Sequence, residues 1–414
     1  MTATVRWPKA LRSLERPELR LFFVAQSVSL LGSWVQPVAQ QWLVWRLTGS
    51  HAMVAWLTFA TQIPSLLLGL WAGAAADRLP KRGLMLASLA VAALQATVLA
   101  VLTLSGWAKA WEVVVLGVLL GLTYPFEIPS RQALLAELAG EATPNVVAFN
   151  STLVTVMRVL GPSAGGALAA LLGEGWCFAF NAVSFLGVIV VVTRLKVTHR
   201  PRASHEASVA EGLKWAWSQR DVRDMFGLLL VLSLFGQAWS PLMPGYVGQT
   251  FHGGVEVLGR LLACAGVGAL LAALGMLFVE SGLSWRIGVG ALAMGFGILV
   301  LSVAPSPAVA AGGAFFVGLG QLTQSSGILS LVQTRAPPAL RGRLLGVFTT
   351  VFVGMVPFGA LAASFVAERW SVWVAQRALA GAMMLGAVAY LLRQRARVSP
   401  LPAGERVAAE SADG

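Results

Sequence analysis

The sequence predicts an all-α polytopic membrane protein with twelve transmembrane helices in two lobes of six. Of its 414 residues, 57% are hydrophobic and 12% are charged, and that charged fraction is about half of the value typical of soluble domains. Continuous apolar runs such as 84–105 and 178–193 are long enough to cross a hydrocarbon core of about 30 Å as helices. A β-barrel would show segments of about 10 residues with alternating polarity. The composition therefore excludes an ordinary soluble enzyme, a disordered chain and a transmembrane barrel.

The apolar spans form two sets of six. The first set covers 20–45, 52–76, 84–105, 112–136, 145–172 and 176–193, and the second covers 224–247, 256–280, 285–304, 308–332, 342–367 and 372–392. The longest polar stretch of the chain separates them. We therefore expect an N-terminal segment (1–19), an N-terminal lobe (20–193), an amphipathic linker (194–223), a C-terminal lobe (224–392) and a disordered tail (393–414).

Basic residues predict the orientation of the chain. With an even number of spans, both termini lie on one side, and most of the 30 Lys and Arg residues fall on that side. The opposite side has Arg46, Lys109, Arg260, Arg369 and Arg377. Cytoplasmic loops are enriched in Lys and Arg, so we expect both termini and the linker in the cytoplasm. This distribution accounts for the net charge of +12 without nucleic acid as a partner.

The linker contains a short amphipathic segment. Leu213, Trp215 and Trp217 stand among basic residues such as Lys214 and Arg220. This pattern predicts a helix that lies at the membrane surface.

The two lobes share a weak internal repeat. The first span reads LGSWVQP from Leu31, and the seventh reads FGQAWSP from Phe235. In both, a Pro follows the Gly by five residues. Residues 162–170 of the fifth span likewise resemble 357–363 of the eleventh. Duplication of a six-helix unit is typical of two-lobed transporters, and chance similarity among Gly-, Ala- and Pro-rich segments is the alternative.

A charged motif lies between the second and third spans. It reads Gly73-Ala-Ala-Ala-Asp77-Arg78-Leu-Pro-Lys81-Arg82. The motif resembles the signature of the major facilitator superfamily, with a Pro where the signature has a Gly before the basic pair. The resemblance implies the major facilitator fold and a conformational latch formed by Gly73, Asp77, Arg78, Lys81 and Arg82. The alternative is a solvent-exposed turn whose charged residues serve only to set the orientation of the chain in the membrane.

A second motif lies in the fifth span and contains Gly161, Pro162, Gly165 and Gly166. It resembles the core of the antiporter signature of the same superfamily, with Met157 where the longer signature has a Gly. The Pro removes one backbone hydrogen bond and can kink the helix, and the glycines allow close helix packing. The resemblance implies export, and tight packing alone is the alternative.

Charged residues at membrane depth are costly and are candidates for function. Glu127 lies deep in the fourth span, with Arg131 one turn later, and Arg158 lies near the middle of the fifth span. We expect Glu127 to be the protonatable group, with Arg158 as its partner or as an anion contact. A permanent structural ion pair is the alternative.

Amide and indole side chains recur in the spans that line the central cavity of the resembled fold. The candidates for this cavity are Trp34, Gln36, Gln40, Gln237, Trp239, Gln321 and Gln324. Such a lining suits a polar aromatic or amphipathic substrate. For any single Gln, hydrogen bonding between helices is the alternative.

Motifs for enzyme chemistry are absent from the sequence. It contains no Walker motif, no HExxH metal site and no GxSxG with suitable His and Asp partners. Cys177 and Cys264 each lie inside an apolar run, which predicts packed residues rather than a disulfide or metal ligands. We therefore expect no enzyme activity, no cofactor and no metal.

Four stretches narrow the resemblance to one bacterial branch. They are QWLVWRLTGS from Gln41, FEIPSRQA from Phe126, FNS from Phe149 and LRGR from Leu340. They resemble the enterobactin-exporter-like efflux proteins, whose relatives also export macrolides and other natural products. The resemblance implies a monomer in the bacterial inner membrane.

The sequence therefore predicts a secondary transporter that exports a small organic molecule, such as a siderophore, an antibiotic or a related natural product. Inward proton movement would drive export by alternating access, with the substrate near mid-membrane between the lobes. The expected partners are this substrate, protons and the lipid bilayer. Proton-coupled uptake is the main alternative, and a non-transporting membrane sensor with the same fold is the second.

Overall fold

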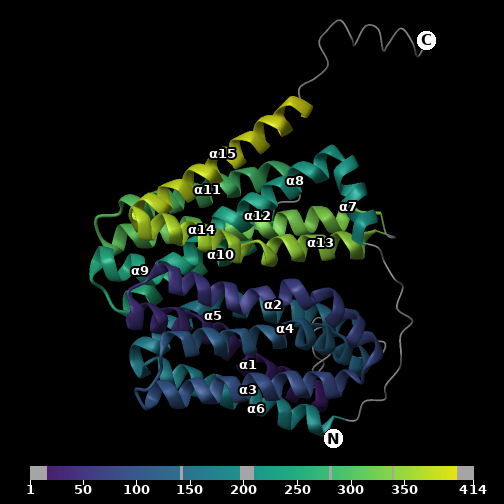
Figure 1. The fold of residues 1–414 in the computed structure, drawn as a ribbon. Helices are drawn as coiled ribbons and strands as arrows, with labels where there is room; N and C mark the ends of the chain where they lie inside the picture. The colour runs from purple at the N-terminus through teal and green to yellow at the C-terminus, as the bar shows by residue number, and fades with distance from the viewer. Residues whose placement is uncertain (1–15, 140–142, 196–208, 279–281, 338–339, 399–414) are drawn as a thin grey trace, which may run out of the picture.

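Two bundles of long helices lie side by side in the protein (Figure 1). The computed structural model describes residues 16–139, 143–195, 209–278, 282–337 and 340–398. Every described element is helical, and among the described residues twelve helical segments are long and apolar enough to cross a membrane. The predicted fold class is confirmed. Residues 1–15, 196–208 and 399–414, which include most of the predicted N-terminal segment and tail and part of the linker, lie outside the described residues.

The N-lobe consists of six helices, each of which is one span. They are α1 (Pro17–Thr48), α2 (His51–Arg78), α3 (Lys81–Leu104), α4 (Ala110–Ala139), α5 (Thr143–Leu172) and α6 (Glu174–Arg194). Helix α3 packs against α4 and α6, and α1 packs against α5 and α6. Helices α2 and α5 are thereby left at the side that meets the second bundle.

The C-lobe repeats this arrangement after the linker helix α7 (Val209–Ser218). Its helices are α8 (Arg220–Val231), α9 (Trp239–Phe251), α10 (Val255–Leu277), α11 (Leu283–Val303), α12 (Pro307–Arg335), α13 (Arg341–Gly354), α14 (Val356–Arg369) and α15 (Val372–Val398). A π-helical turn, η3 (Leu232–Gly236), joins α8 to the turn before α9. The segment from α8 to α9 is one span, and α13 with α14 is another.

The molecule has two ends along the direction of its helices, the linker end and the distal end. The linker end is the end where α1 begins and α7 lies, on the right of Figure 1, and the distal end is the opposite one, which carries the α1–α2 turn.

Proline explains why two C-lobe spans are broken. Pro241 has no N–H, so it cannot donate to the carbonyl of Gln237, and the helix is interrupted between η3 and α9. Pro357 stands in the first turn of α14, directly after the break at Met355. The corresponding N-lobe helices α1 and α5 instead continue through Pro37 and Pro162.

The repeat predicted from the Gly and Pro spacing has a counterpart in the packing. A Cβ on Gly32 of α1 would meet Asn181 of α6, and a Cβ on Gly236 would lie 3.1 Å from the sulfur of Met383 of α15. Each glycine therefore packs against the sixth span of its own lobe. The missing side chain allows the first and sixth spans of each lobe to approach closely.

The apolar core differs between the two ends of the N-lobe. At the distal end, residues such as Trp42 and Val44 belong to one cluster with Tyr246 and Val247 of the C-lobe. At the linker end, Phe22, Met85 and other N-lobe residues form a separate cluster that contains no C-lobe residue. The lobes therefore share a hydrophobic core at the distal end, whereas the linker half of the N-lobe has a core of its own.

Candidate functional site

Most contacts between the lobes run along two pairs of spans, α5 with α10 and α2 with the span formed by α13 and α14. Along the first pair, a Cβ on Gly166 would overlap the Cα of Gly259, so the two backbones touch. Two turns closer to the linker end, a Cβ on Gly266 would lie 2.7 Å from the carbonyl oxygen of Val159. Glycine is required at these positions because any side chain would push the lobes apart.

The motif of the fifth span thus serves two different contacts. Gly161 and Gly165 face α1, where a Cβ would meet Trp34 and Val35 respectively, while Gly166 faces α10 of the other lobe. Successive residues of a helix are rotated by about 100°, so neighbouring glycines contact different partners. The expectation of close packing is met, and the packing includes the boundary between the lobes.

The second pair of helices runs from the distal end to the middle of the bundle. The rings of Phe59 on α2 and Phe358 on α14 meet edge to face, with centroids 5.9 Å apart. Closer to the linker end, a Cβ on Gly354 would lie 2.6 Å from a methyl carbon of Leu66. Both helix pairs therefore hold the lobes together from the distal end to mid-bundle.

Hydrogen bonds join the lobes at the distal end. One carboxylate oxygen of Glu368 on α14 accepts from the hydroxyl of Ser50 at 2.7 Å and from the backbone N–H of Ala52 at 3.1 Å. Ser50 and Ala52 flank the first residue of α2. Glu368 therefore caps a helix of the other lobe, where the helix dipole favours negative charge.

A second distal contact surrounds His51, the first residue of α2. Its Nε2 lies 3.3 Å from Oε1 of Gln249 on α9, and its ring lies 4.9 Å from the ring of Trp45. Both rings rest on bare backbone of α9, because Cβ atoms on Gly245 and Gly248 would meet His51 and Trp45. The distal end is therefore closed by polar contacts and by aromatic rings packed on glycine.

Arg158 lies just on the linker side of this closed region, next to Val159. Its guanidinium carbon stands 5.9 Å from the ring centroid of Trp34 on α1, which is a cation–π distance. The Arg158 side chain is exposed, and Trp34 is half-buried.

The expected contact between Glu127 and Arg158 is not formed. Glu127 instead pairs with Arg131 at 3.1 Å, one turn further along α4, and both side chains are largely buried. Residues four apart on a helix are neighbours, so the local partner is reached without any movement of α5. Glu127 and Arg158, the two candidates for proton coupling, therefore have separate partners in this structure.

The candidates Gln36 and Gln40 lie inside the N-lobe and face no cavity, because they are 0% and 2% exposed. The amide nitrogen of Gln36 donates to Gln95 of α3 at 3.0 Å, and its oxygen accepts from Asn181 of α6 at 2.6 Å. The network is completed by Gln40 and Ser184. These residues hydrogen-bond to one another, and only the amide nitrogens of Gln40 and Gln95 have no partner in the described part of the network. Such a network is the interhelical alternative to a cavity lining.

The C-lobe candidates are also mostly engaged with protein. Gln324 is fully buried and donates to the carbonyl of Leu228, and Gln237 donates to the carbonyl of Phe352 on α13 at 2.9 Å. Trp239 is buried and Gln321 is half-buried. Among the seven cavity candidates, Trp34, Gln237 and Gln321 thus keep partly accessible side chains.

The basic pair of the predicted latch holds the N-lobe together at the linker end. Lys81 pairs with Glu137 of α4 at 2.6 Å, and Arg82 donates to the carbonyl of Thr193 at the end of α6. Gly73, Asp77 and Arg78 belong to the last turns of α2, and the surroundings of their side chains lie outside the described part of the structure. Their role as a latch stays a prediction.

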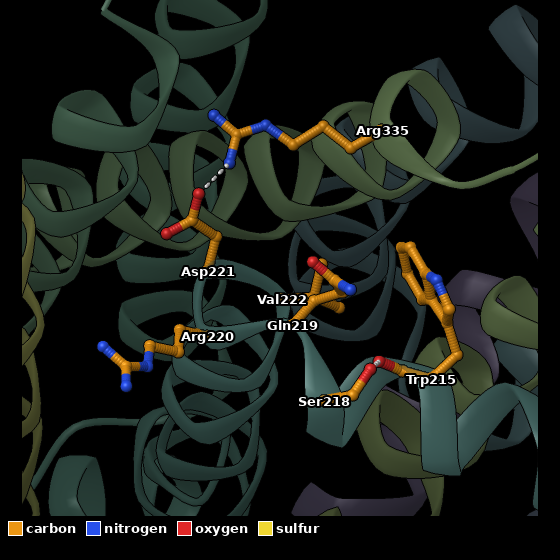
Figure 2. Close-up of a pocket in the computed structure, with 7 residues that line it drawn as sticks. All are labelled: Trp215, Ser218, Gln219, Arg220, Asp221, Val222 and Arg335. Atoms are coloured by element: carbon orange, nitrogen blue, oxygen red, sulfur yellow. Dashed lines mark hydrogen bonds and ion pairs between the residues drawn. The ribbon is translucent and has the colours of Figure 1, made fainter. Parts of the chain in front are cut away.

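A pocket lies at the linker end of the C-lobe, away from Arg158. Its lining residues are Trp215, Ser218, Gln219, Arg220, Asp221, Val222 and Arg335. Figure 2 shows Arg335 of α12 reaching toward Asp221 at the start of α8, to which it is paired at 3.1 Å. This pair is about half-exposed on both sides and connects the linker region to α12.

Comparison with known proteins assigns the family. A family of major facilitator transporters described as transmembrane secretion effectors matches residues 9–412. The chain belongs to this family. It is accordingly a multi-pass membrane transporter, and its described residues contain twelve helical segments long and apolar enough to cross a membrane, as the sequence predicts.

Curated relatives of this transporter are themselves transporters. Its sequence is 28% identical to the multidrug efflux pump Tap of Mycolicibacterium fortuitum over 91% of this chain and 96% of that protein. It is 27% identical to Tap of Mycobacterium tuberculosis over 85% and 88%. It is 26% identical to the staphyloferrin A transporter of Staphylococcus aureus over 62% and 66%.

Solved structures share the fold at low sequence identity. The nucleoside transporter NupG superposes with a TM-score of 0.74 at 11% identity, over 91% of this chain and 99% of that one. A bacterial homologue of the lysosomal transporter Spinster, inward-facing and occupied, superposes with a TM-score of 0.70 at 15% identity, over 91% and 96%. These matches show the fold alone.

Sequence reasoning missed the distal contact of Glu368 with Ser50. The two residues are 318 positions apart, and Glu368 stands just beyond the predicted end of its span. A Ser directly before an apolar helix is a recognisable N-terminal signal, but no local pattern indicates which carboxylate completes it.

Proposed function

We propose that this transporter exports a small organic molecule from a bacterial cytoplasm through the inner membrane, by alternating access. The observation that carries the proposal is that the two lobes are in contact along only one part of the boundary between them. The lobes touch from the distal end to mid-bundle, and the linker half of the N-lobe has its own core. In a transporter whose lobes meet in this way, the residues between the lobes at mid-bundle are accessible from the linker end.

The linker end is the cytoplasmic end in this proposal. Lys and Arg concentrate there, as the positive-inside rule expects. A substrate would enter between the lobes from the cytoplasm, and separation of the distal contacts would release it outside. The relatives described as multidrug efflux pumps support export as the direction.

Proton movement into the cell drives export in this proposal, with Glu127 as the proton carrier. Glu127 is an acidic residue at membrane depth whose present partner is the neighbouring Arg131. Protonation of Glu127 would weaken its pair with Arg131, so the conformation of the N-lobe would depend on whether Glu127 carries a proton. The transporter acts as a monomer.

Accumulation assays in efflux-deficient bacterial cells test this function. The cells express wild type or Asp77→Asn and are loaded with a panel that contains ethidium, macrolides, siderophores and carboxyfluorescein. We expect wild type to lower the accumulation of its substrates. Asp77→Asn should not produce this reduction, and a protonophore should abolish it. Higher accumulation with wild type across the panel would instead show uptake and overturn the proposal.

A further inference from the structure

Arg158 has a positive charge without a carboxylate partner among the described residues. The other charges at membrane depth in the N-lobe, Glu127 and Arg131, pair with each other and cancel. In the described C-lobe spans, charged side chains stand near the ends, such as Asp224 and Arg335 at the linker end and Glu368 and Arg377 at the distal end. Arg158 thus gives the middle of the molecule a net positive charge.

The side of α5 that carries Arg158 is polar and accessible. Ser151, Thr155 and Arg158 are all exposed and follow one another at spacings of four and three residues, which places them on one face of the helix. The exposed residues of the opposite face, Val156 and Leu160, are apolar and suit contact with lipid. Polar groups on the lipid side would be costly, so the face of Arg158 is the one that borders the space between the lobes.

The neighbours of α5 define where this face points. Gly161 and Gly165 turn toward α1, and Val159 and Ser163 turn toward Gly266 of α10 in the other lobe. The polar face lies between these two contacts. Arg158 therefore stands between α1 of one lobe and α10 of the other, directly beside the contact of Val159 with Gly266.

Trp34 and Gly161 hold the guanidinium in place. A Cβ on Gly161 would overlap Trp34, so the indole lies directly on the α5 backbone. From that position its ring faces the Arg158 guanidinium at 5.9 Å. A cation–π contact orients the guanidinium and leaves its N–H groups available as donors, and a planar fork of such donors matches a carboxylate.

We infer that Arg158 binds the acidic group of an anionic substrate, an organic carboxylate whose aromatic or apolar part packs beside Trp34. This inference rests on the proposed transport function and adds the charge class of the substrate. An arginine at membrane depth without a carboxylate partner is costly. A bound carboxylate would supply the missing countercharge, whereas a cationic substrate would meet electrostatic repulsion.

Binding to the purified full-length protein tests the inference without reference to direction. The probes are three matched triplets: naphthoate, naphthamide and naphthylmethylamine; biphenylcarboxylate with its amide and amine; and indole-3-acetate, indole-3-acetamide and tryptamine. Saturable shifts of the thermal unfolding temperature give the affinity. We expect carboxylates to bind at least tenfold more tightly than the amides and amines of the same ring.

Three variants connect this preference to Arg158. Arg158→Gln should remove it, and Arg158→Lys should retain part of it because the charge remains. Arg260→Gln is the matched control, since it removes an exposed arginine near the distal end. Equal binding of all three charge classes by wild type, or an unchanged carboxylate preference in Arg158→Gln, would overturn the inference.

Transport of two dyes separates this inference from the proposed function. Cells are loaded with carboxyfluorescein, an anion, or with ethidium, a cation. If carboxylates bind through Arg158 but the anion enters the cells rather than leaving, export is wrong and the anion site stands. If ethidium leaves by a route that Arg158→Gln does not affect and the carboxylates do not bind, export stands and the anion site is wrong.

Discussion

Glu368 of the C-lobe accepts a hydrogen bond from the hydroxyl of Ser50 in the N-lobe, with 2.7 Å between Oε1 and Oγ. The same oxygen accepts from the backbone of Ala52. One lobe thereby completes the first turn of a helix in the other lobe. The alternating-access motion that we propose must break this cap each time the distal end opens, so its strength bears directly on the balance between the two states.

Glu368→Ala should increase the population in which the distal end is open. Hydrogen bonds to a charged group contribute about 1.5–3 kcal/mol each, so we expect the open population to rise about tenfold or more. Spin labels at the exposed positions Leu47 and Trp370 would report the separation by pulsed electron resonance, with both native cysteines replaced by Ala.

Glu112→Ala is the matched control for this measurement. Glu112 also stands at the distal end, but it accepts from the backbone of Lys109 within its own lobe. Its loss should leave the separation between the labels unchanged. An identical response of the two variants would mean that the Glu368 cap does not hold the lobes together.

Gly166→Val should prevent closure of the distal end. A Cβ at this position already overlaps the Gly259 backbone, and backbone atoms cannot move aside as a flexible side chain can. We expect the distal labels to remain apart and transport to fall at least tenfold, with the folded protein preserved because the distal-open state relieves the overlap. Gly187→Ala on α6 is the control, since a Cβ there meets nothing within 4 Å. Distal closure at the wild-type distance in Gly166→Val would contradict this account.

Gln36→Leu should lower stability and leave substrate preference unchanged. The substitution leaves the amides of Gln95 and Asn181 without their present partner in a buried site, which costs about 1–3 kcal/mol for each unsatisfied group. Thermal unfolding followed by tryptophan fluorescence measures the loss. Gln41→Leu makes the same change at a half-buried position and should cost less. A changed substrate profile with unaltered stability would support the cavity role that the sequence predicts for Gln36.

Glu127→Gln should separate binding from proton-driven transport. The amide cannot release a proton, so an imposed pH gradient should no longer drive substrate into everted membrane vesicles, while substrate binding persists. Glu112→Gln removes a carboxylate at the distal end and should transport as wild type does. Accumulation by Glu127→Gln at the wild-type rate would exclude this residue as the proton carrier.

The motif of the fifth span shows how far local sequence can predict the site. The three glycines predict close packing, and each of them is packed against a neighbouring backbone or side chain. Which helix each one meets depends on the assembly, because Gly165 and Gly166 point in directions about 100° apart. The partner of Glu127 also differs from the expected one. Glu127 pairs with Arg131, which lies one turn away on the same helix, whereas the expected partner Arg158 lies on α5.

The sequence by itself determined the number, order and approximate length of the twelve spans. A helix that crosses a hydrocarbon core needs about 20 apolar residues whatever it later contacts, so this property is local. Only the tertiary structure decided that Glu368 caps α2, that Gln36 is buried in a network and that Arg158 stands beside Trp34 with no carboxylate partner among the described residues. These relationships join residues far apart in the chain, and they depend on how the helices pack and rotate against one another, which no local pattern of hydrophobicity specifies.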